Sequence, residues 1–406
     1  MDSNQPYYIH LPNALLKGIS QCLEEIIFND SYSDKAVANM LKSHKSWGSR
    51  DRRTATAIIY DISRNLLKYQ FICERVGLFQ SQKDKIKDLV AISLYFNATY
   101  KDKLEIDESI QSQIEAITNL PIHLTHSLQE WLYNALKNDW GKKTASLLSS
   151  LDEVAPVYIR INPLKSTIDQ FQIELEKLKI EYQIHPEIDY AIEIKSKNQL
   201  RHTKVFNSGF FEFQDIGSQY IIHQCDIQPE QTVIDFCAGK GGKTLQLAAL
   251  MNENGKLIAS DIDNSRLEHL ERRAKRAGIT FLEILPNDQL LKMNEVQADI
   301  VFIDAPCTGT GTLRRQADIK FRLKEADLKE VLQVQSQILE QAHPLLHPNG
   351  KLIYATCSVL KSENEKQIES FLKKHNNFRL VSEEYILPEK LNSDSFYMAI
   401  LEKTDN

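Results

Sequence analysis

Two cysteines in the C-terminal half of the chain each follow a short apolar run, and both positions could serve chemistry. The run Val301–Ile303 is β-prone and leads directly into Asp304, and Cys307 follows three residues later. Residues 351–356 form a second such run, and Cys357 comes directly after it. A thiolate can attack a substrate and form a covalent intermediate. An acid and a thiol delivered to one place therefore indicate a candidate active site for nucleophilic catalysis.

The pairing of the two cysteines carries more weight than either cysteine alone, because a lone cysteine is more commonly a buried structural residue. Pro306 cannot continue a strand, and Gly309 and Gly311 allow the next loop to bend back over Cys307. Ligands of open parallel sheets bind outside the carboxyl ends of the strands. If the two strands are neighbours, both sulfur atoms point into one crevice.

A repeated strand and helix pattern in the C-terminal half would position these residues. Strands are expected over residues 232–236, 256–260 and 281–285, and a helix is expected over 245–251. Together with the two strands that precede the cysteines, this pattern predicts a doubly wound α/β domain.

The loop after the first of these strands has the sequence C-A-G-K-G-G-K-T and begins at Cys237. Its glycines let the backbone approach a ligand closely, and the following helix start offers free N–H groups. Asp261 ends the next strand, where it could bind a ribose diol, and Asp288 lies beyond the third strand, where an adenine could be read.

Three ligands compete for this loop. Gly242-Lys243-Thr244 resembles the end of a phosphate-binding loop, but Cys237 stands where that pattern requires glycine. A nicotinamide enzyme would carry G-x-G-x-x-G, which the loop does not provide. A diol acid, an adenine-side acid and a glycine loop fit S-adenosylmethionine better than either a nucleoside triphosphate or a dinucleotide.

The first half of the chain contains no comparable motif. Residues 10–148 are expected to be helical throughout, and the basic residues Arg50, Arg52 and Arg53 precede a helix with apolar residues at helical spacing. Residues 156–205 suggest a small strand–helix–strand unit in which Arg160 shares a polar face with Asn162. We expect the helical part to dock a polar partner.

Composition narrows the class of protein. The net charge of −6 is not that of a general nucleic-acid binder, so an RNA partner would be held by local basic patches. Six cysteines without a C-x-x-C pair favour reduced thiols in a cytoplasmic protein. No leader peptide and no membrane association are expected, since no apolar run approaches the roughly 20 residues of a membrane span. No metal site is expected either.

The motifs together resemble the bacterial ribosomal RNA cytosine-C5 methyltransferases of the Sun/Fmu (RsmB-like) type. The likeness rests on C-A-G-K-G-G-K-T, S-D-I-D-N-S-R-L, D-A-P-C-T-G-T-G-T-L-R-R and Y-A-T-C-S, and extends upstream to F-E-F-Q-D-I-G-S-Q, I-R-I-N-P-L-K and S-R-D-R-R. It implies a NusB-like helical RNA-binding domain at 1–148, a small RRM-like α/β domain at 149–205 and a Rossmann-like catalytic domain at 206–406.

The resemblance also implies roles for particular residues. The thiol of the T-C motif is the nucleophile in this family, which assigns that role to Cys357, and the thiol of the P-C motif assists product release, which assigns that role to Cys307. The residues implied for S-adenosylmethionine are Cys237, Ala238, Gly239, Lys240, Gly241, Gly242, Lys243, Asp261, Asp288 and Asp304. Lys240 and Ala317 depart from the prolines usual in the family, which affects affinity more than activity.

The activity implied is methylation of C5 of a cytosine in ribosomal RNA, of the small subunit, by a monomeric enzyme. C5 is a poor nucleophile, and a thiolate that adds to C6 makes it reactive. Asp304 would polarise the ring if protonated or orient the exocyclic amine if ionised. Such a base must leave its stack, so the substrate is single-stranded, looped or flipped RNA. The expected RNA contacts are Arg50, Arg52, Arg53, Arg160, Arg314 and Arg315.

Two other functions are compatible with parts of this pattern. A catalytically silent RNA-binding assembly factor would have no need of both thiols, Asp304 and the glycine loop. A DNA cytosine methyltransferase would place its nucleophile at Cys307 and need nothing at Cys357. The phenotypes of the two cysteine variants distinguish these functions.

Overall fold

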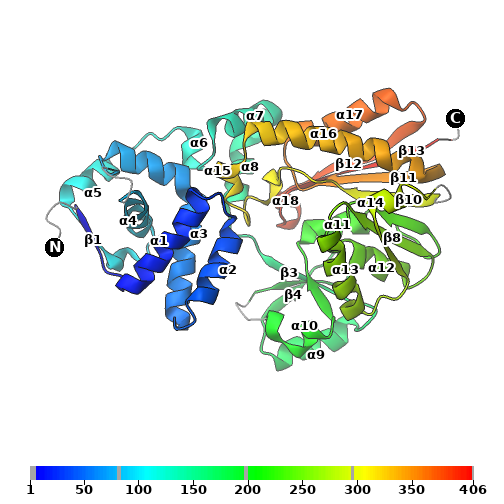
Figure 1. Cartoon of the computed structure of the whole chain (residues 1–406), viewed down its shortest axis with the longest axis horizontal. Helices are drawn as coiled ribbons and strands as arrows, with labels where there is room; N and C mark the ends of the chain where they lie inside the picture. Colours follow the sequence, from blue (N-terminus) through cyan, green and yellow to red (C-terminus); the bar gives the residue numbers. More distant parts are fainter. Residues whose placement is uncertain (1–5, 80–83, 196–199, 294–296, 405–406) are drawn as a thin grey trace. The chain divides into compact units, whose positions relative to one another are not determined.

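The chain forms two compact units in the computed structural model, which describes residues 6–79, 84–195, 200–293 and 297–404. One unit comprises residues 1–152 together with 315–325, and the other comprises residues 153–314 together with 326–406 (Figure 1). The first unit is therefore built from two separate stretches of sequence.

Helices make up most of the first unit, and their apolar faces form one core. In α1, for example, the buried residues Leu15, Ile19, Leu23 and Ile26 recur at helical spacing. The elements are β1 (Tyr7–Ile9), α1 (Asn13–Ile27), α2 (Ser33–Ser43), α3 (Ser49–Arg75), α4 (Lys85–Phe96), β2 (Leu104–Ile106), α5 (Glu108–Glu115), α6 (Ile122–Thr125), α7 (Glu130–Trp140), α8 (Thr144–Asp152) and α15 (Ile319–Arg322).

The prediction that residues 10–148 are helical throughout was wrong at one place. Residues 104–106 form β2, which pairs antiparallel with β1. The long helix α3 is also interrupted at Asn65, whose side chain donates to the carbonyl of Asp61 at 3.0 Å. A side chain that hydrogen-bonds to the backbone in this way competes with the helical pattern.

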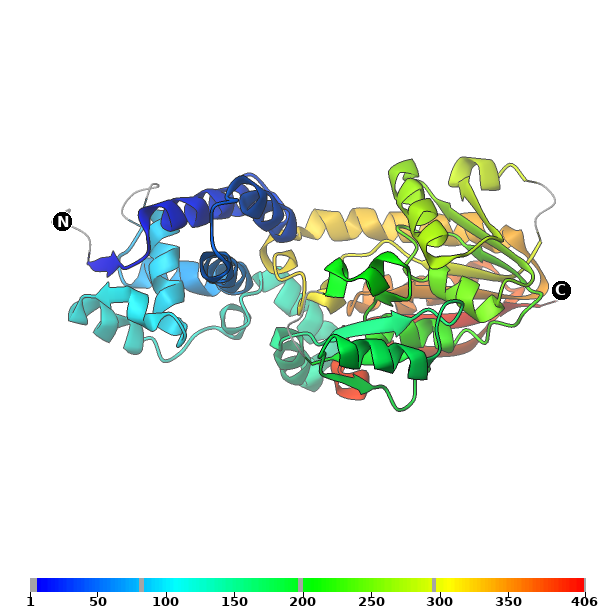
Figure 2. The same cartoon turned by 90° about the horizontal axis from the view of Figure 1, so that it is seen from below.

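A small four-stranded antiparallel sheet opens the second unit, with the order β4-β5-β3-β6. Its elements are β3 (Val157–Ile161), α9 (Ile168–Lys177), β4 (Tyr182–Ile184), β5 (Ala191–Ile194), α10 (Lys204–Asn207) and β6 (Phe211–Phe213). The helix α9 lies along one face of this sheet (Figure 2). Its residues Phe171 and Leu175 are buried in the core that it shares with the sheet. Because β6 pairs with β3, the small sheet extends past residue 205, the boundary predicted from the sequence.

A seven-stranded sheet follows, with the order β12-β13-β11-β10-β7-β8-β9. The five strands from β11 to β9 are parallel, and β13 and β12 are antiparallel at one edge. The elements are α11 (Ile216–His223), β7 (Thr232–Asp235), α12 (Thr244–Met251), β8 (Lys256–Asp261), α13 (Asn264–Ala277), β9 (Leu282–Pro286), α14 (Asn287–Leu290), β10 (Ala298–Asp304), α16 (Glu325–Ala342), β11 (Leu346–Thr356), α17 (Glu365–Lys374), β12 (Phe378–Ile386), α18 (Pro388–Leu391) and β13 (Phe396–Lys403).

Helices cover both faces of this sheet, as the doubly wound pattern predicts (Figure 1). Successive residues of β10 alternate between the two resulting cores, with Ile300 and Phe302 on one side and Val301 and Ile303 on the other. Side chains of α11, α12 and α13 fill the first core, and side chains of α16 and α17 fill the second.

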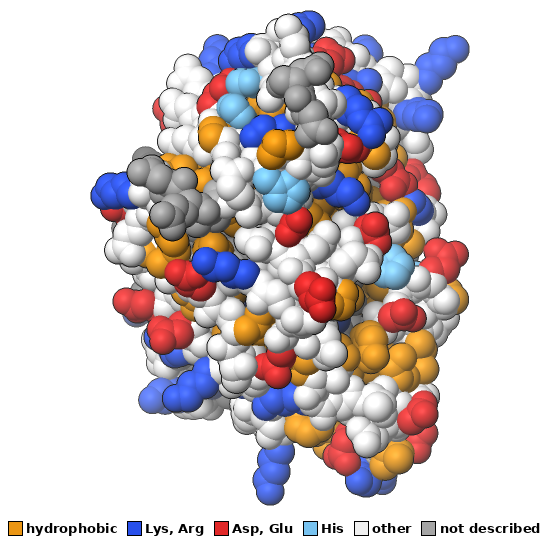
Figure 3. All heavy atoms as spheres, turned by 90° about the vertical axis from the view of Figure 1, so that its right-hand side faces the viewer, with side chains coloured by type: hydrophobic (Ala, Val, Ile, Leu, Met, Phe, Trp, Pro, Cys, Tyr) orange, Lys and Arg blue, Asp and Glu red, His pale blue; other side chains and the backbone are white. Residues whose placement is uncertain are grey.

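Surface properties agree with the low net charge. Acidic and basic side chains are interspersed on the face shown in Figure 3. Within the described residues, no helix combines the length and the apolar character needed to span a bilayer.

Candidate active site

The carboxyl edge of the parallel strands gathers the residues that the sequence singles out. β10 and β11 are adjacent and parallel, with Asp304 paired in register with Ala355. The condition set by the sequence, that the two cysteine strands be neighbours, is therefore met. Asp235, Asp261 and Asp304 each end a strand of this part of the sheet.

The two thiols face each other, with 3.3 Å between Cys307 Sγ and Cys357 Sγ. The hydrogen bond with Cys357 and the burial of the side chain both raise the pKa of Cys307 well above its ordinary value. Cys307 is therefore held as a neutral thiol beside Cys357. If the two cysteines only filled space in the core, their sulfur atoms would have no need to be in contact. Their contact therefore favours a shared function.

Gly311 holds the loop that follows Cys307 against the backbone of Cys357. Its N–H donates to the carbonyl of Cys357 at 2.8 Å. A Cβ at this position would lie 2.1 Å from the carbonyl oxygen of Ser395 and 2.8 Å from that of Cys357. Only glycine fits so close an approach of two backbones.

A buried carboxylate that the sequence analysis missed stands behind the thiols. Glu363 accepts hydrogen bonds from the N–H of Thr308 at 2.8 Å, from the hydroxyl of Thr308 at 2.5 Å, from Gln335 Nε2 at 3.1 Å and from the hydroxyl of Ser358. Thr308 and Ser358 each directly follow one of the two cysteines. Glu363 thus ties both cysteine loops together, and burial raises its pKa. The sequence around it, S-E-N-E, is that of an ordinary polar surface segment and does not predict a buried glutamate.

Lys243 connects the glycine loop with the thiols. Its Nζ lies 2.6 Å from Asp304 Oδ2, and its side chain is almost completely buried. Burial opposes the charge on Lys243, but the Asp304 carboxylate and, more weakly, the sulfur of Cys357 raise its pKa. The residue therefore remains an ammonium and supplies positive charge beside Asp304.

The glycine loop has the shape that a bound cofactor needs. Gly239 has a φ of 53° and donates its N–H to Asp261 Oδ2 at 2.8 Å. Beside Gly239 and Gly242 the structure has open space, because a Cβ at either position would meet nothing within 4 Å. Gly241 instead packs on Leu270, where a Cβ would come within 2.2 Å of a methyl group. One side of the loop thus has room for a ligand, and the other side packs against α13.

The remaining residues predicted for the cofactor surround this loop. Cys237 and Ala238 follow β7, and the N–H of Ala238 donates to the carbonyl of Ser260 at 2.8 Å. Lys240 is exposed, and its carbonyl accepts from Arg273 at 2.5 Å. Asp288 lies at the start of α14 with an exposed side chain 3.2 Å from Lys292. These residues fit S-adenosylmethionine, with acids at the sugar and adenine ends and an open glycine loop between them.

Two of the arginines predicted to contact RNA have other roles. The guanidinium of Arg160 is buried and lies 3.4 Å from the carbonyl of Gly242, so it supports the cofactor loop. The guanidinium of Arg314 is also buried and donates to the carbonyls of Ser393 at 2.8 Å and Val154 at 3.1 Å. Both predictions were wrong, because buried arginines bound to carbonyl groups are not available to phosphates.

The basic residues of the first unit differ in exposure. Arg50 and Arg53 are exposed at the start of α3. Arg52 is half-buried and donates to the carbonyls of Trp47 at 3.0 Å and His44 at 3.2 Å, which fixes the connection between α2 and α3. Arg315 is exposed in the stretch 315–325.

The same stretch contains the second departure from the family pattern. Ala317 is buried in the first unit, and Asp318 accepts a hydrogen bond from the N–H of Ser33 at 3.2 Å. The position at which proline is usual therefore belongs, in this chain, to the packing of the helical unit.

The fold defines a Rossmann-like, S-adenosylmethionine-dependent methyltransferase, and its candidate active site contains a pair of cysteines. Residues 223–402 match the family described as 16S rRNA methyltransferase RsmB/F, and residues 128–201 match the ferredoxin-like domain of RsmF/B-like methyltransferases. The chain belongs to the RsmB/F family of ribosomal RNA methyltransferases, which confirms the family predicted from the motifs.

Relatives cover most of the chain. It is 26% identical to a probable ribosomal RNA small subunit methyltransferase B of Synechocystis sp., over 94% of this chain and 97% of that protein. It is 30% identical to ribosomal RNA small subunit methyltransferase B of Photorhabdus laumondii, over 71% and 69% of the two chains. The crystal structure of NSun6 from Pyrococcus horikoshii with SFG has a similar fold, with a TM-score of 0.63, 19% identity, and coverage of 69% of this chain and 99% of that one.

Proposed function

We propose that this enzyme methylates C5 of a cytosine in small-subunit ribosomal RNA through a covalent bond between Cys357 and C6. The observation that carries the proposal is the 3.3 Å contact between the two thiols at the ends of adjacent strands. A methyltransferase acting on a nitrogen or oxygen atom would need no sulfur nucleophile, because such atoms carry a lone pair of their own.

The covalent step makes an unreactive carbon nucleophilic. Cys357 Sγ, as the thiolate, forms a bond to C6, and the electron pair of the C5–C6 bond moves toward C5. When bound, S-adenosylmethionine would supply an electrophilic methyl group to C5, and its sulfur would leave as a neutral thioether when the methyl–sulfur bond breaks. The C5 proton then passes to a base, the C5–C6 double bond re-forms, and the C6–S bond breaks to return the thiolate of Cys357.

Other residues prepare the ring and complete the release. Cys307, held as a neutral thiol, donates a hydrogen bond to the sulfur of Cys357 before attack and assists the elimination afterwards. Asp304 lies beside Lys243, which balances its charge, and as a carboxylate it accepts a hydrogen bond from the exocyclic amine of cytosine. The raised pKa of Lys243 supports this arrangement.

RNA binding is assigned to the helical unit and the small sheet. We infer that residues 1–152 form a NusB-like RNA-binding domain and that the ferredoxin-like sheet acts as an RRM-like module. The exposed Arg50, Arg53 and Arg315 are the remaining candidates for phosphate contacts. Six free thiols support a reducing, cytoplasmic location, and we propose that the enzyme acts as a monomer.

The two cysteine variants test the chemistry, because each should fail in its own way. Cys357→Ala removes the nucleophile, so neither adduct nor product should form with radiolabelled ribosomal RNA. Cys307→Ala leaves addition and methyl transfer possible but hinders elimination. This variant should accumulate a covalent protein–RNA species, visible as a slow band on a denaturing gel.

Cys225→Ala is the matched control, since Cys225 is a fully buried thiol of the same unit outside the site. It should give normal product and no trapped band. A trapped band from Cys357→Ala, or none from Cys307→Ala, would contradict the assignment. Activity lost in Cys307→Ala but kept in Cys357→Ala would favour the arrangement of DNA cytosine methyltransferases. A wild-type level of product from both variants would contradict covalent catalysis altogether.

A further inference from the structure

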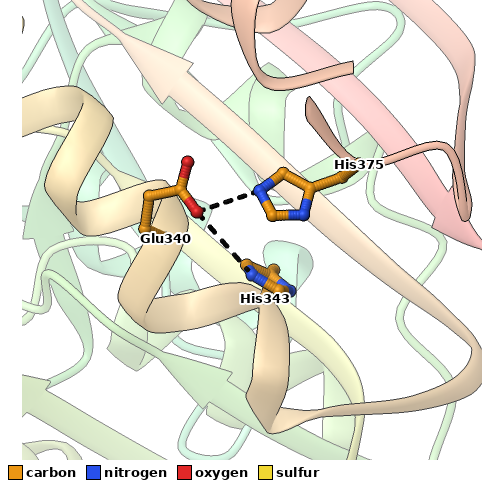
Figure 4. A group of neighbouring side chains, drawn as sticks. All are labelled: Glu340, His343 and His375. Atoms are coloured by element: carbon orange, nitrogen blue, oxygen red, sulfur yellow. Dashed lines mark hydrogen bonds and ion pairs between the residues drawn. The ribbon is translucent and has the colours of Figure 1, made fainter. Parts of the chain in front are cut away.

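Three side chains with metal-binding donors meet on the second unit, among helices that cover the sheet. Glu340 lies in the last turn of α16, His343 directly follows that helix, and His375 directly follows α17. The three side chains point toward one another (Figure 4). Glu340 Oε2 lies 2.9 Å from His375 Nε2 and 4.0 Å from His343 Nε2, and one donor atom from each residue lies within 4.8 Å of the others.

The imidazole rings are held in place by aromatic packing. The ring of His375 lies 4.4 Å from that of Phe371, and the ring of His343 lies 5.8 Å from that of Phe378, measured between centroids. The two imidazole centroids are 4.3 Å apart. Two histidines fixed this close together, with their Nε2 atoms turned to one carboxylate, are pre-organised as ligands.

Charge at the cluster also suits a cation. His343 and His375 each present one ring nitrogen to the cluster, and a neutral imidazole nitrogen can offer a lone pair to a cation. Glu340 adds a carboxylate oxygen as the third donor of the cluster. Two cations oppose a metal ion, namely Lys374, whose Nζ is 3.3 Å from Glu340 Oε1, and the more distant Lys403.

We propose that Glu340, His343 and His375 bind a zinc ion with water as the fourth ligand. Neutral imidazole and carboxylate are ligands that zinc prefers, at about 2.0–2.2 Å. Tetrahedral bonds of that length separate the ligand atoms by about 3.3 Å. Glu340 Oε2 lies 2.9 and 4.0 Å from the two histidines, and all three donor atoms lie within 4.8 Å of one another. The side chain of Glu340 is 40% exposed, so it can turn by the small amount required.

Such an ion would join the ends of two helices, α16 and α17, that are separated in the sequence by β11. α16 and α17 cover the same face of the sheet, and the three ligands stand just before β11 and β12. A metal that binds the folded state and not the unfolded chain stabilises the fold by an amount that grows with the logarithm of its concentration. The cluster contains no residue of the glycine loop and neither of the two thiols, so the effect we expect of the ion is on stability. The sequence alone predicted no metal site, because the ligand spacing follows no recognised motif.

Calorimetry with zinc chloride on the full-length chain tests the proposal. The adjacent thiols could also bind zinc, so every variant is made in a Cys307→Ser, Cys357→Ser background. We expect one zinc ion per chain, and at least about tenfold weaker binding after His343→Gln or His375→Gln. Zinc should raise the midpoint of thermal unfolding of the parent protein, and that increase should vanish in both variants.

His347 provides the matched control. Its Nε2 lies 2.8 Å from Asp299 Oδ1, so it forms the same kind of histidine–carboxylate pair on the same unit without a second histidine. His347→Gln should bind zinc as the parent does. Glu340→Gln, at an exposed position that does not endanger folding, should weaken binding about tenfold or more. No zinc uptake by the parent, or equal affinity in the parent and the His375→Gln variant, would reduce the cluster to an ion pair.

Discussion

At the scale of single residues, the cofactor loop rests on a buried acid that is not in contact with solvent. Asp235 ends β7 and accepts a hydrogen bond from the hydroxyl of Thr244 at 2.6 Å. Its other oxygen, Oδ1, has no hydrogen-bond partner among the described residues. Burial raises the pKa of Asp235 to about 7, although the bond from Thr244 opposes the shift. A protonated Asp235 therefore belongs to the stable form of the fold.

This raised pKa gives a prediction about stability and pH. An unfolded aspartate has a pKa near 3.9, so between about pH 4 and 7 the folded state binds more protons here than the unfolded state. The contribution of Asp235 is thus fully present below pH 4 and is lost as pH rises to 7, at up to about 1.4 kcal/mol per pH unit. Urea denaturation should show that the free energy of unfolding of the wild type falls across this pH range, and that this fall is absent in Asp235→Asn.

Asp299→Asn serves as a control of opposite sign. Although burial opposes it, hydrogen bonds from His347 and the N–H of Thr232 lower the pKa of Asp299, so its contribution is present above the unfolded pKa and is lost as pH falls. The asparagine variant should therefore lose stability chiefly at neutral pH. Parallel curves for Asp235→Asn and the wild type would show that Asp235 is ionised in the fold.

The site residues were predictable to the extent that their chemistry shows in a local pattern. Cys307, Cys357 and Asp304 follow β-prone runs, and a strand end fixes where such residues lie. The roles of Arg160 and Arg314 were not predictable, because alternation along a short strand does not reveal which face a neighbouring loop will cover. Their positive charge suggested phosphates, but backbone carbonyls are their partners in the fold.

At the scale of elements, one carboxylate connects three parts of the catalytic domain. Glu363 precedes α17 and binds the loop after β10, the loop after β11 and Gln335 of α16. Its own carbonyl accepts from the hydroxyl of Tyr354 in β11 at 2.8 Å. The geometry of the thiol pair thus depends on a residue that lies in neither cysteine loop.

Glu363→Gln should therefore weaken the fold and disturb the site together. The amide keeps the shape of the side chain but turns an NH2 group toward donors that have lost their acceptor, at a cost of about 1–3 kcal/mol. We expect a lower urea midpoint and slower methylation of ribosomal RNA. Glu369→Gln, at an exposed position of α17, should change stability by less than about 0.5 kcal/mol. Equal stability of the two variants would mean that the Glu363 network contributes little.

The elements themselves were predicted unevenly. The parallel strands and the glycine loop followed from apolar runs and from residues with special backbone geometry. The short strand β6 was assigned to the wrong domain, since its partner β3 lies about fifty residues earlier and pairing over that distance leaves no local signal. The Glu340–His343–His375 cluster was missed for the same reason, because its histidines come from separate helices.

At the scale of the whole molecule, a net charge of −6 means that RNA must be held by a few exposed cations. Replacing Arg50 and Arg53 together by glutamine should weaken RNA binding and reduce the slope of log K against log salt, by about 0.7 for each lost contact with single-stranded RNA. Affinity for S-adenosylmethionine and the thermal midpoint should not change. Filter binding over a series of salt concentrations measures the slope.

Two further variants separate charge from structure. Arg52→Gln should lower the thermal midpoint, because its guanidinium holds the carbonyls between α2 and α3. Arg75→Gln, at the exposed far end of α3, should leave both stability and RNA affinity unchanged. If the Arg50 and Arg53 replacement keeps the wild-type slope, the start of α3 is an ordinary solvated surface.

The stretch 315–325 completes the helical unit although it is encoded far from it. Lys320 is buried and donates to the carbonyl of His126 at 3.0 Å and to Asp152 at 2.5 Å, and Phe321 packs into the helical core. A recombination event at residue 152 would therefore transfer the helices without the piece that finishes their core. The two units must therefore be inherited together. A chimera that joins residues 1–152 of one homologue to the remainder of another should fold poorly, because the helical core and residues 315–325 would come from different proteins.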